Sequence, residues 1–145
     1  MVNQVVLKGN LAQSPYFDFV GDTGRAFLRI YLAVDRPKVG GPRGERRDSA
    51  DFFRVVTYDD LALFSYPYLQ PGSEVLVIGR LRARKRRLPN GKRETVVEVI
   101  ATDITFLRKI NWDAGDAERE RILQERAAQK ERQAARTQSG EETRS

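Results

Sequence analysis

The 145-residue sequence contains no cysteine and no histidine. Without cysteine the chain forms no disulfide, no thiolate metal site and no cysteine nucleophile. The lack of histidine removes the commonest general base and the commonest metal ligand together. The sequence also has no phosphate-binding glycine loop of the nucleotide-hydrolase type. We therefore expect a protein that is not an enzyme and that uses no metal and no cofactor.

Long apolar runs are missing as well. The first ten residues, MVNQVVLKGN, contain no apolar stretch longer than 5–7, and the longest aliphatic run in the strand-like centre covers 75–78. A signal peptide or a membrane span needs a much longer apolar segment. The sequence therefore predicts a soluble, cytoplasmic protein.

The charge is basic and unevenly distributed. The chain carries 26 Lys and Arg against 20 Asp and Glu, a net charge of +6. Residues 1–110 hold 19 basic and 12 acidic side chains, whereas residues 111–145 hold 7 and 8. The excess favours a polyanionic partner, although charge alone does not separate nucleic acid from an acidic membrane surface. The basic surface belongs to the first 110 residues.

The same boundary separates two kinds of sequence. Residues 1–110 form short β-like segments divided by turns, and the expected strands cover 3–11, 25–34, 51–58, 74–87 and 94–107, the last as one strand or a pair of strands. A short helix over 60–66, with Asp59 as its cap, is expected between the third and fourth strands. Five strands with one helix indicate an all-β oligonucleotide-binding (OB) barrel. Residues 111–145 are rich in alanine and charge, which predicts a helical or disordered tail.

The stretch DFFRVVTY at 51–58 has two different faces. Successive side chains of a strand point to opposite sides of the sheet. One face is an ordinary apolar surface, and the other combines two rings with a guanidinium group. The first face is Phe53, Val55 and Thr57, and the second is Phe52, Arg54, Val56 and Tyr58.

The strand at 25–34 repeats this combination. Its inward side chains are apolar, and its outward side chains include two rings and an arginine. The inward set is Ala26, Leu28, Ile30, Leu32 and Val34, and the outward set is Phe27, Arg29 and Tyr31. Aromatic rings stack on unpaired bases while guanidinium groups bind phosphates, so this combination suits a single nucleic-acid strand.

Two further segments add positive charge. The segment 36–50 has many glycines, prolines and charges without periodicity, and it predicts a long loop that carries Lys38 and several arginines. The fourth strand ends in RLRARKRR, with Arg80, Arg82, Arg84 and Arg86 on one parity. Like charges in a row repel one another unless a polyanion lies across them. No acidic residue lies within 80–89 to neutralise the run.

Simpler structural roles compete with these interpretations. Phe52 and Tyr58 could cover a barrel end or pack against another subunit, and the arginine run could be a solvated hairpin. Asp59 and Asp60 suit a helix start better than a metal pair. The tail is interpreted as a solvated helix or a disordered extension.

The chain resembles bacterial-type single-stranded DNA-binding proteins over about residues 2–108. The resemblance rests on an ordered set of motifs: VVLKGNLAQSP, LAVDRP, DFFRVVTYDDLA and YLQPGSEVLVIGRLRARK. It implies an OB fold, a homotetramer and the wrapping of single strands by stacking and phosphate contacts. A dimer remains an alternative assembly.

The resemblance also implies roles for individual residues. Phe52 occupies a position that is commonly a stacking tryptophan, and Tyr58 occupies one that is commonly another ring. Lys38 and Arg86 replace further stacking tryptophans, which predicts more reliance on charge. The chain ends in SGEETRS, so the acidic and apolar tip through which such proteins recruit partners is expected to be absent. The complete expected nucleic-acid-binding set is Arg29, Tyr31, Lys38, Phe52, Arg54, Tyr58, Arg80, Arg82, Arg84, Lys85 and Arg86.

The leading hypothesis is non-sequence-specific binding and protection of single-stranded DNA in replication, recombination and repair, in a bacterium, plasmid or phage. Such a protein is expected at the nucleoid. An RNA-binding OB module is an alternative, because the same surface tolerates either sugar. An adaptor that binds a protein through its helical tail is another.

Overall fold

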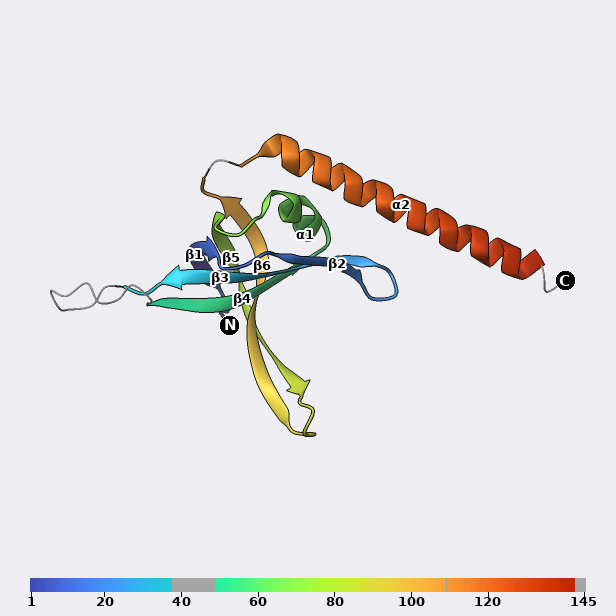
Figure 1. The fold of residues 1–145 in the computed structure, drawn as a ribbon. Coiled ribbons are helices and arrows are strands. Elements are labelled where there is room, and N and C mark those ends of the chain that lie inside the picture. Colours follow the sequence, from blue (N-terminus) through green and yellow to red (C-terminus); the bar gives the residue numbers. More distant parts are fainter. Residues whose placement is uncertain (38–48, 109, 143–145) are drawn as a thin grey trace. The chain divides into compact units, whose positions relative to one another are not determined.

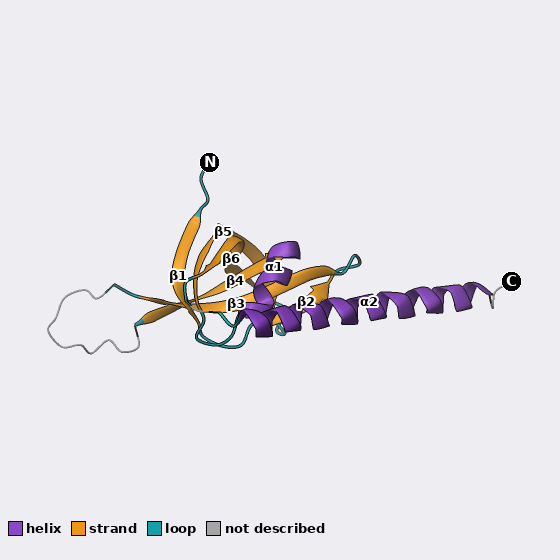
Figure 2. Cartoon of the chain, turned by 90° about the horizontal axis from the view of Figure 1, so that it is seen from above, coloured by secondary structure: helices purple, strands orange, loops and turns teal. Residues whose placement is uncertain are grey.

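The computed structural model describes residues 1–37, 49–108 and 110–142. The chain divides into two compact units, Met1–Ile110 and Asn111–Ser145. Strands make up most of the first unit, and the second is a single helix, as the colours of Figure 2 show. Among the described residues, no helix has both the length and the apolar composition of a membrane span.

Six strands form one sheet that closes on itself (Figure 1). Their order is β1-β5-β6-β4-β3-β2, and an additional pairing between β1 and β3 closes the barrel. The all-β barrel predicted from the sequence is therefore confirmed. The strands are β1 (Val5–Leu11), β2 (Tyr16–Val20), β3 (Arg25–Asp35), β4 (Ala50–Tyr58), β5 (Glu74–Arg87) and β6 (Arg93–Phe106).

The apolar parity of β3 forms the centre of the core. Leu28, Ile30 and Leu32 are each at most 1% exposed. They pack with Val55 of β4 and with Val77 of β5, among other buried side chains. The predicted inward face of this strand is confirmed, and Val34 at its end is only partly buried. Its outward rings and arginine therefore lie on the outer face of the barrel.

The sequence predicted about five strands, and the structure has six because one short strand was missed. Residues Tyr16–Val20 form β2, which pairs antiparallel with β3 from Tyr16↔Arg29 to Val20↔Arg25. Phe17 and Phe19 pack against the core, so β2 also follows a two-residue period. The short helix consequently lies between the fourth and fifth strands of the structure.

That helix, α1 (Asp59–Ser65), continues into the single 3-10 turn η1 (Tyr66–Tyr68). The expectation that Asp59 caps α1 was wrong. The N-cap residue is Tyr58, and no side chain makes a capping hydrogen bond. Asp59 itself has φ 60, in the left-handed region that aspartate enters more readily than most residues. Its carboxylate pairs with Arg25 of β3.

The barrel consists of two antiparallel groups joined by short seams. One group is β1, β5 and β6, and the other is β2, β3 and β4. Across the first seam β4 and β6 run parallel and are paired only at Val55↔Val99 and Val56↔Ile100. Across the second seam β1 and β3 are paired only at Asn10↔Ala33 and Leu11↔Leu32. The two groups are therefore joined by far fewer paired residues than each group has within itself.

The β5–β6 ladder extends beyond the barrel as a long hairpin arm (Figure 1). Its register shifts at a bulge between Ile78 and Gly79, where the arm begins. A Cβ atom at Gly79 would lie 2.1 Å from the carbonyl oxygen of Ile100. Only glycine therefore permits this close approach of the two backbones.

The second unit is the helix α2 (Trp112–Glu142). The Oδ1 atom of Asn111 accepts a hydrogen bond from the backbone N–H of Ala114 at 3.0 Å and so caps the first turn. Arg121 pairs with Glu118 and, at 2.7 Å, with Glu125. Such pairs one turn apart stabilise an exposed helix. Of the two expected forms of the tail, the structure has the helix.

Candidate nucleic-acid interface

The outer face of the sheet gathers most of the residues singled out from the sequence. Residues directly opposite each other on paired strands share a face of the sheet. Tyr31 lies opposite Arg54, and Arg82 lies opposite Glu98. The parallel pairing of Val55 with Val99 puts Arg54 beside Glu98 in the same way. The rings and guanidinium groups of β3, β4 and β5 therefore lie on one continuous surface.

On β4 the four side chains of this face differ in accessibility. Phe52 is 66% exposed, whereas Arg54 and Tyr58 are partly buried. Val56 is 1% exposed, so it is a buried residue and not part of the accessible surface. Phe52 is therefore the ring on this strand whose surface is most available to a flat partner.

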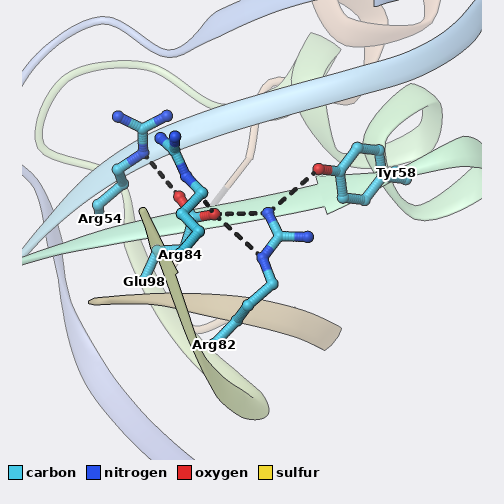
Figure 3. Close-up of polar contacts among 5 residues, drawn as sticks. All are labelled: Arg54, Tyr58, Arg82, Arg84 and Glu98. Carbon is cyan, nitrogen blue, oxygen red and sulfur yellow. Dashed lines mark hydrogen bonds and ion pairs between the residues drawn. The ribbon is translucent and has the colours of Figure 1, made fainter. Parts of the chain in front are cut away.

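A single buried carboxylate joins three of the arginines (Figure 3). The Glu98 side chain is 1% exposed. Its Oε1 atom accepts a hydrogen bond from Nη2 of Arg82 at 2.5 Å and one from Nε of Arg84 at 3.2 Å. Its Oε2 atom lies 2.9 Å from Nε of Arg54, an ion pair without good hydrogen-bond geometry. We call Glu98, Arg54, Arg82 and Arg84 the arginine cluster.

Glu98 remains charged in this environment. Burial acts to raise the pKa of its carboxyl group, but the hydrogen bond from Arg82 and the charges of Arg82, Arg84 and Arg54 outweigh that effect. The pKa of Glu98 therefore lies below its usual value. The arginine cluster consequently holds three positive charges and one negative charge, a surplus that still attracts anions.

The expectation that no acid neutralises the arginine run was wrong. The acids come from the neighbouring strand: Glu98 lies opposite Arg82, and Glu94 forms an ion pair with Arg86. Sequence reasoning missed Glu98, although a carboxylate between Val97 and Val99 in an apolar strand was a usable signal. A buried acid needs cationic or hydrogen-bonding partners.

The remaining basic residues of the arm are arranged differently. Arg80 is exposed at the start of the arm. Lys85 has the opposite parity to Arg84, so it lies on the other face, where its Nζ donates to Oγ1 of Thr95 at 2.8 Å. The structure therefore does not bring Lys85 together with the arginine cluster.

A second group of rings and guanidinium groups lies on β2 and β3. The guanidinium carbon of Arg29 lies 4.7 Å from the ring centroid of Tyr16 and 5.9 Å from that of Tyr31. The Tyr16 and Phe27 rings meet edge to face at 6.2 Å. Phe27 was predicted as an outward ring but was left out of the expected binding set, and Tyr16 was not singled out, although its aromatic character was an available signal. The group alternates rings with cations along the sheet.

Tyr58 connects the two groups. Its ring lies 5.4 Å from that of Phe27, and the guanidinium carbon of Arg25 lies 4.6 Å from its centroid. Its hydroxyl oxygen accepts a long hydrogen bond from Nη2 of Arg82 at 3.4 Å. One part of this ring is therefore already covered, in contrast to Phe52.

Arg25 is fixed by two hydrogen bonds to the Asp59 carboxylate, at 3.0 and 2.8 Å. The hydrogen bond from Arg25 lowers the pKa of Asp59, against a smaller opposing effect of burial. The pair holds the guanidinium group against Tyr58 and, at the same time, the start of α1. Sequence reasoning did not single out Arg25.

Part of the loop expected at 36–50 lies within the described residues. Arg36 pairs with Asp51 at 2.8 Å. Lys38 lies outside the described residues, as do Arg43, Arg46 and Arg47.

The outer face therefore offers an exposed ring, partly covered rings and a surplus of guanidinium groups. Rings of this kind can stack on flat aromatic groups, and guanidinium groups bind phosphate oxygens. Within the described residues, no group of three or more acidic side chains could hold a metal ion.

Comparison with known proteins gives a consistent result. The model of the Single-strand binding protein family matches residues 2–107. A "Single-stranded DNA-binding protein" of Thermotoga maritima is 34% identical over 106 residues, covering 72% of this chain and 73% of that protein. One of Clostridium tetani is also 34% identical over 106 residues, covering 73% of this chain and 70% of that protein.

A solved structure has the same fold. It is a deletion mutant of the single-stranded DNA binding protein from Thermus aquaticus, and it superposes with a TM-score of 0.56 at 26% identity. The match covers 74% of this chain but only 42% of that one, so the chain spans less than half of that protein.

Proposed function

Because the chain belongs to the single-strand binding protein family, we propose that it binds single-stranded DNA without sequence specificity and protects it during replication, recombination and repair. The observation that carries the proposal is Phe52, a ring that is 66% exposed on the same sheet face as the arginine cluster. The ring would stack on a base while the guanidinium groups bind the phosphates on either side.

The proposed contacts follow the accessibility of the side chains. Phe52 would supply the principal stacking surface, and Tyr58, Tyr31 and Arg29 would continue it towards β3. Arg54, Arg82 and Arg84 would bind phosphates, with Arg80 and Arg86 extending the path along the arm. Lys85 lies on the other face of the arm, so we assign it a contribution through long-range charge alone.

Titration of the protein with a homopolymeric single strand and with the matching duplex, at two salt concentrations, tests the proposal. We expect strong preference for the single strand, because paired bases hide the faces on which Phe52 stacks. Affinity should fall steeply with salt, since each phosphate neutralised on a single strand contributes about −0.7 to the slope of log K against log salt. Equal affinity for both forms, or no response to salt, would contradict the proposal.

A matched RNA strand in the same titration distinguishes DNA from RNA as the preferred ligand. We expect DNA to compete better, as the relatives from Thermotoga maritima and Clostridium tetani bear the name of DNA-binding proteins. Stronger binding of RNA would favour an RNA-binding OB module.

We propose that the protein assembles as a homotetramer, because it resembles bacterial-type single-stranded DNA-binding proteins. Sedimentation at several concentrations tests it, and a stable dimer or monomer would contradict it. A protein that coats single strands acts where DNA is copied, so a fluorescent fusion should gather at the nucleoid.

A further inference from the structure

Among the described residues, Glu98 differs from the other acidic side chains of the outer face in the number of arginines that it holds. Three arginines from two strands converge on one carboxylate whose side chain is 1% exposed. Arg82 and Arg84 come from β5, and Arg54 comes from β4 on the other side of β6. Glu98 therefore fixes cationic groups across the seam between the two halves of the barrel.

The atoms used in these contacts leave the outer donors of the arginines available. Arg54 and Arg84 contact Glu98 through Nε, the nitrogen nearest the backbone. Their terminal nitrogens lie on the side away from the carboxylate (Figure 3), and among the described residues the structure records no partner for them. The arginine side chains are between 22% and 35% exposed, so these donors can be reached from solvent.

Guanidinium groups this close to one another would separate without an anion between them. An arginine side chain also has several rotatable bonds, and ordering it on binding has an entropic cost. In the free protein, the Glu98 carboxylate offsets the repulsion between the guanidinium groups. It also orders the arginine side chains before any ligand binds, so that this entropic cost does not fall on binding. Its single negative charge still leaves the arginine cluster with a surplus of two positive charges.

We propose that Glu98 is a positioning residue for nucleic-acid binding, which holds Arg54 and Arg84 through Nε and Arg82 through Nε and Nη2, so that their remaining terminal nitrogens face the phosphates. The inference rests on the proposed function. It differs from a simple charge effect, because an acid beside a polyanion site should otherwise weaken binding. Removal of this acid is expected to weaken binding instead.

The decisive comparison is Glu98→Gln with Glu94→Gln. Both substitutions remove one negative charge from β6, and Glu94 pairs with a single arginine among the described residues, Arg86, further along the arm. Glu94→Gln should leave single-strand affinity unchanged or slightly higher. Glu98→Gln should lower it about three- to tenfold, the factor expected from ordering one or two arginine side chains on binding. Its salt slope should be shallower than that of the wild type, because fewer phosphates are bound at once.

Affinity for Glu98→Gln equal to or above the wild type, or a steeper salt slope, would overturn the proposal. Arg84→Lys provides a second variant if Glu98→Gln does not fold. It keeps the charge, but lysine has one nitrogen to share between Glu98 and a phosphate. It should also bind several-fold more weakly, and wild-type affinity would overturn the proposal.

A measurement without DNA separates this inference from the proposed function. Nitrogen NMR of the free protein should show sharp, slowly exchanging Nε–H signals for Arg82 and Arg84, whose Nε atoms donate to Glu98. These signals should be lost in Glu98→Gln and kept in Glu94→Gln. Absence of such signals in the wild type would overturn the positioning role even if single strands bind. Absence of single-strand binding with these signals present would overturn the proposed function, and with it the role of Glu98 in binding.

Discussion

Among the residues of the outer face, Phe52 gives the sharpest mutational test, because its ring is 66% exposed in the folded chain. Phe52→Ala should lower single-strand affinity by about 1–3 kcal/mol, the range for one base stacked on one ring. The free energy of unfolding should change little, since the ring buries little surface on folding. Fluorescence titration and urea denaturation measure the two quantities.

Val55 on the same strand is the control. It is 1% exposed and belongs to the core. Val55→Ala should reduce the free energy of unfolding by about 2 kcal/mol and leave the affinity of the folded protein intact. The opposite result, with Phe52→Ala unfolding the protein and Val55→Ala impairing binding alone, would reverse the assignment of the two faces.

Strand parity predicted which face of β4 carries Phe52 and Tyr58, but not how the two rings differ. The difference comes from the neighbouring strand, because Phe27 lies directly opposite Tyr58 and Arg25 packs on its ring. Those contacts depend on the register between β3 and β4. A pattern within one strand contains no information about that register, so the sequence could predict the candidate face but not the accessibility of its rings.

Glu98 also gives a pH prediction. Its pKa is lower in the folded chain than the ordinary value of 4.5, so its ion pairs contribute stability above the unfolded pKa. That contribution is lost as the pH falls through the lower, folded pKa. The free energy of unfolding should therefore decrease on acidification from pH 5 to pH 3. Glu98→Gln should show a smaller decrease in urea denaturation over the same range, and an equal decrease would contradict the shift.

At the scale of elements, the bulge at Gly79 controls where the arm leaves the barrel. Gly79→Ala should destabilise the domain by about 3 kcal/mol, because the added Cβ meets the carbonyl oxygen of Ile100 and the backbone must move. Gly91, at the tip of the arm, is the matched control. It has φ +82 with open space around a Cβ, so Gly91→Ala should cost only about 1 kcal/mol of backbone strain. Urea denaturation of both variants tests the difference, and equal costs would contradict the close approach.

The elements most fully predicted were those with long, regular alternation, such as β3. The strand that was missed, β2, has five residues between Pro15 and the turn at 21–24. Its alternation, with Phe17 and Phe19 on one parity and Tyr16 and Asp18 on the other, is real but short. Pairing with β3 stabilises it, and that contact involves residues outside the segment. Short edge strands depend on such tertiary contacts more than on their own pattern.

At the scale of the whole molecule, we propose that residues 1–110 are an independent single-strand-binding domain. The core cluster is drawn from residues between Leu11 and Ile104. The helix α2 makes its own ion pairs, and residues 111–145 carry a net charge near zero. A chain that ends at Ile110 should therefore fold, assemble and bind single strands with nearly full affinity. Sedimentation and titration test this, and loss of assembly together with binding would show that the tail is needed for both.

The two short seams of the barrel have a mechanical consequence. The strands within each antiparallel half are paired over many residues. Across the seams, β4 and β6 are paired at two residue pairs, and so are β1 and β3. Local unfolding should therefore separate the two halves at these seams before the strands within either half lose their pairing. A bound DNA strand that contacts both Phe52 of β4 and Arg82 of β5 would connect the two halves across the β4–β6 seam. In hydrogen exchange, the amides at this seam should then slow more on binding than the amides of the β2–β3 ladder, which takes no part in the seam. The seam amides are those of Val55, Val56, Val99 and Ile100.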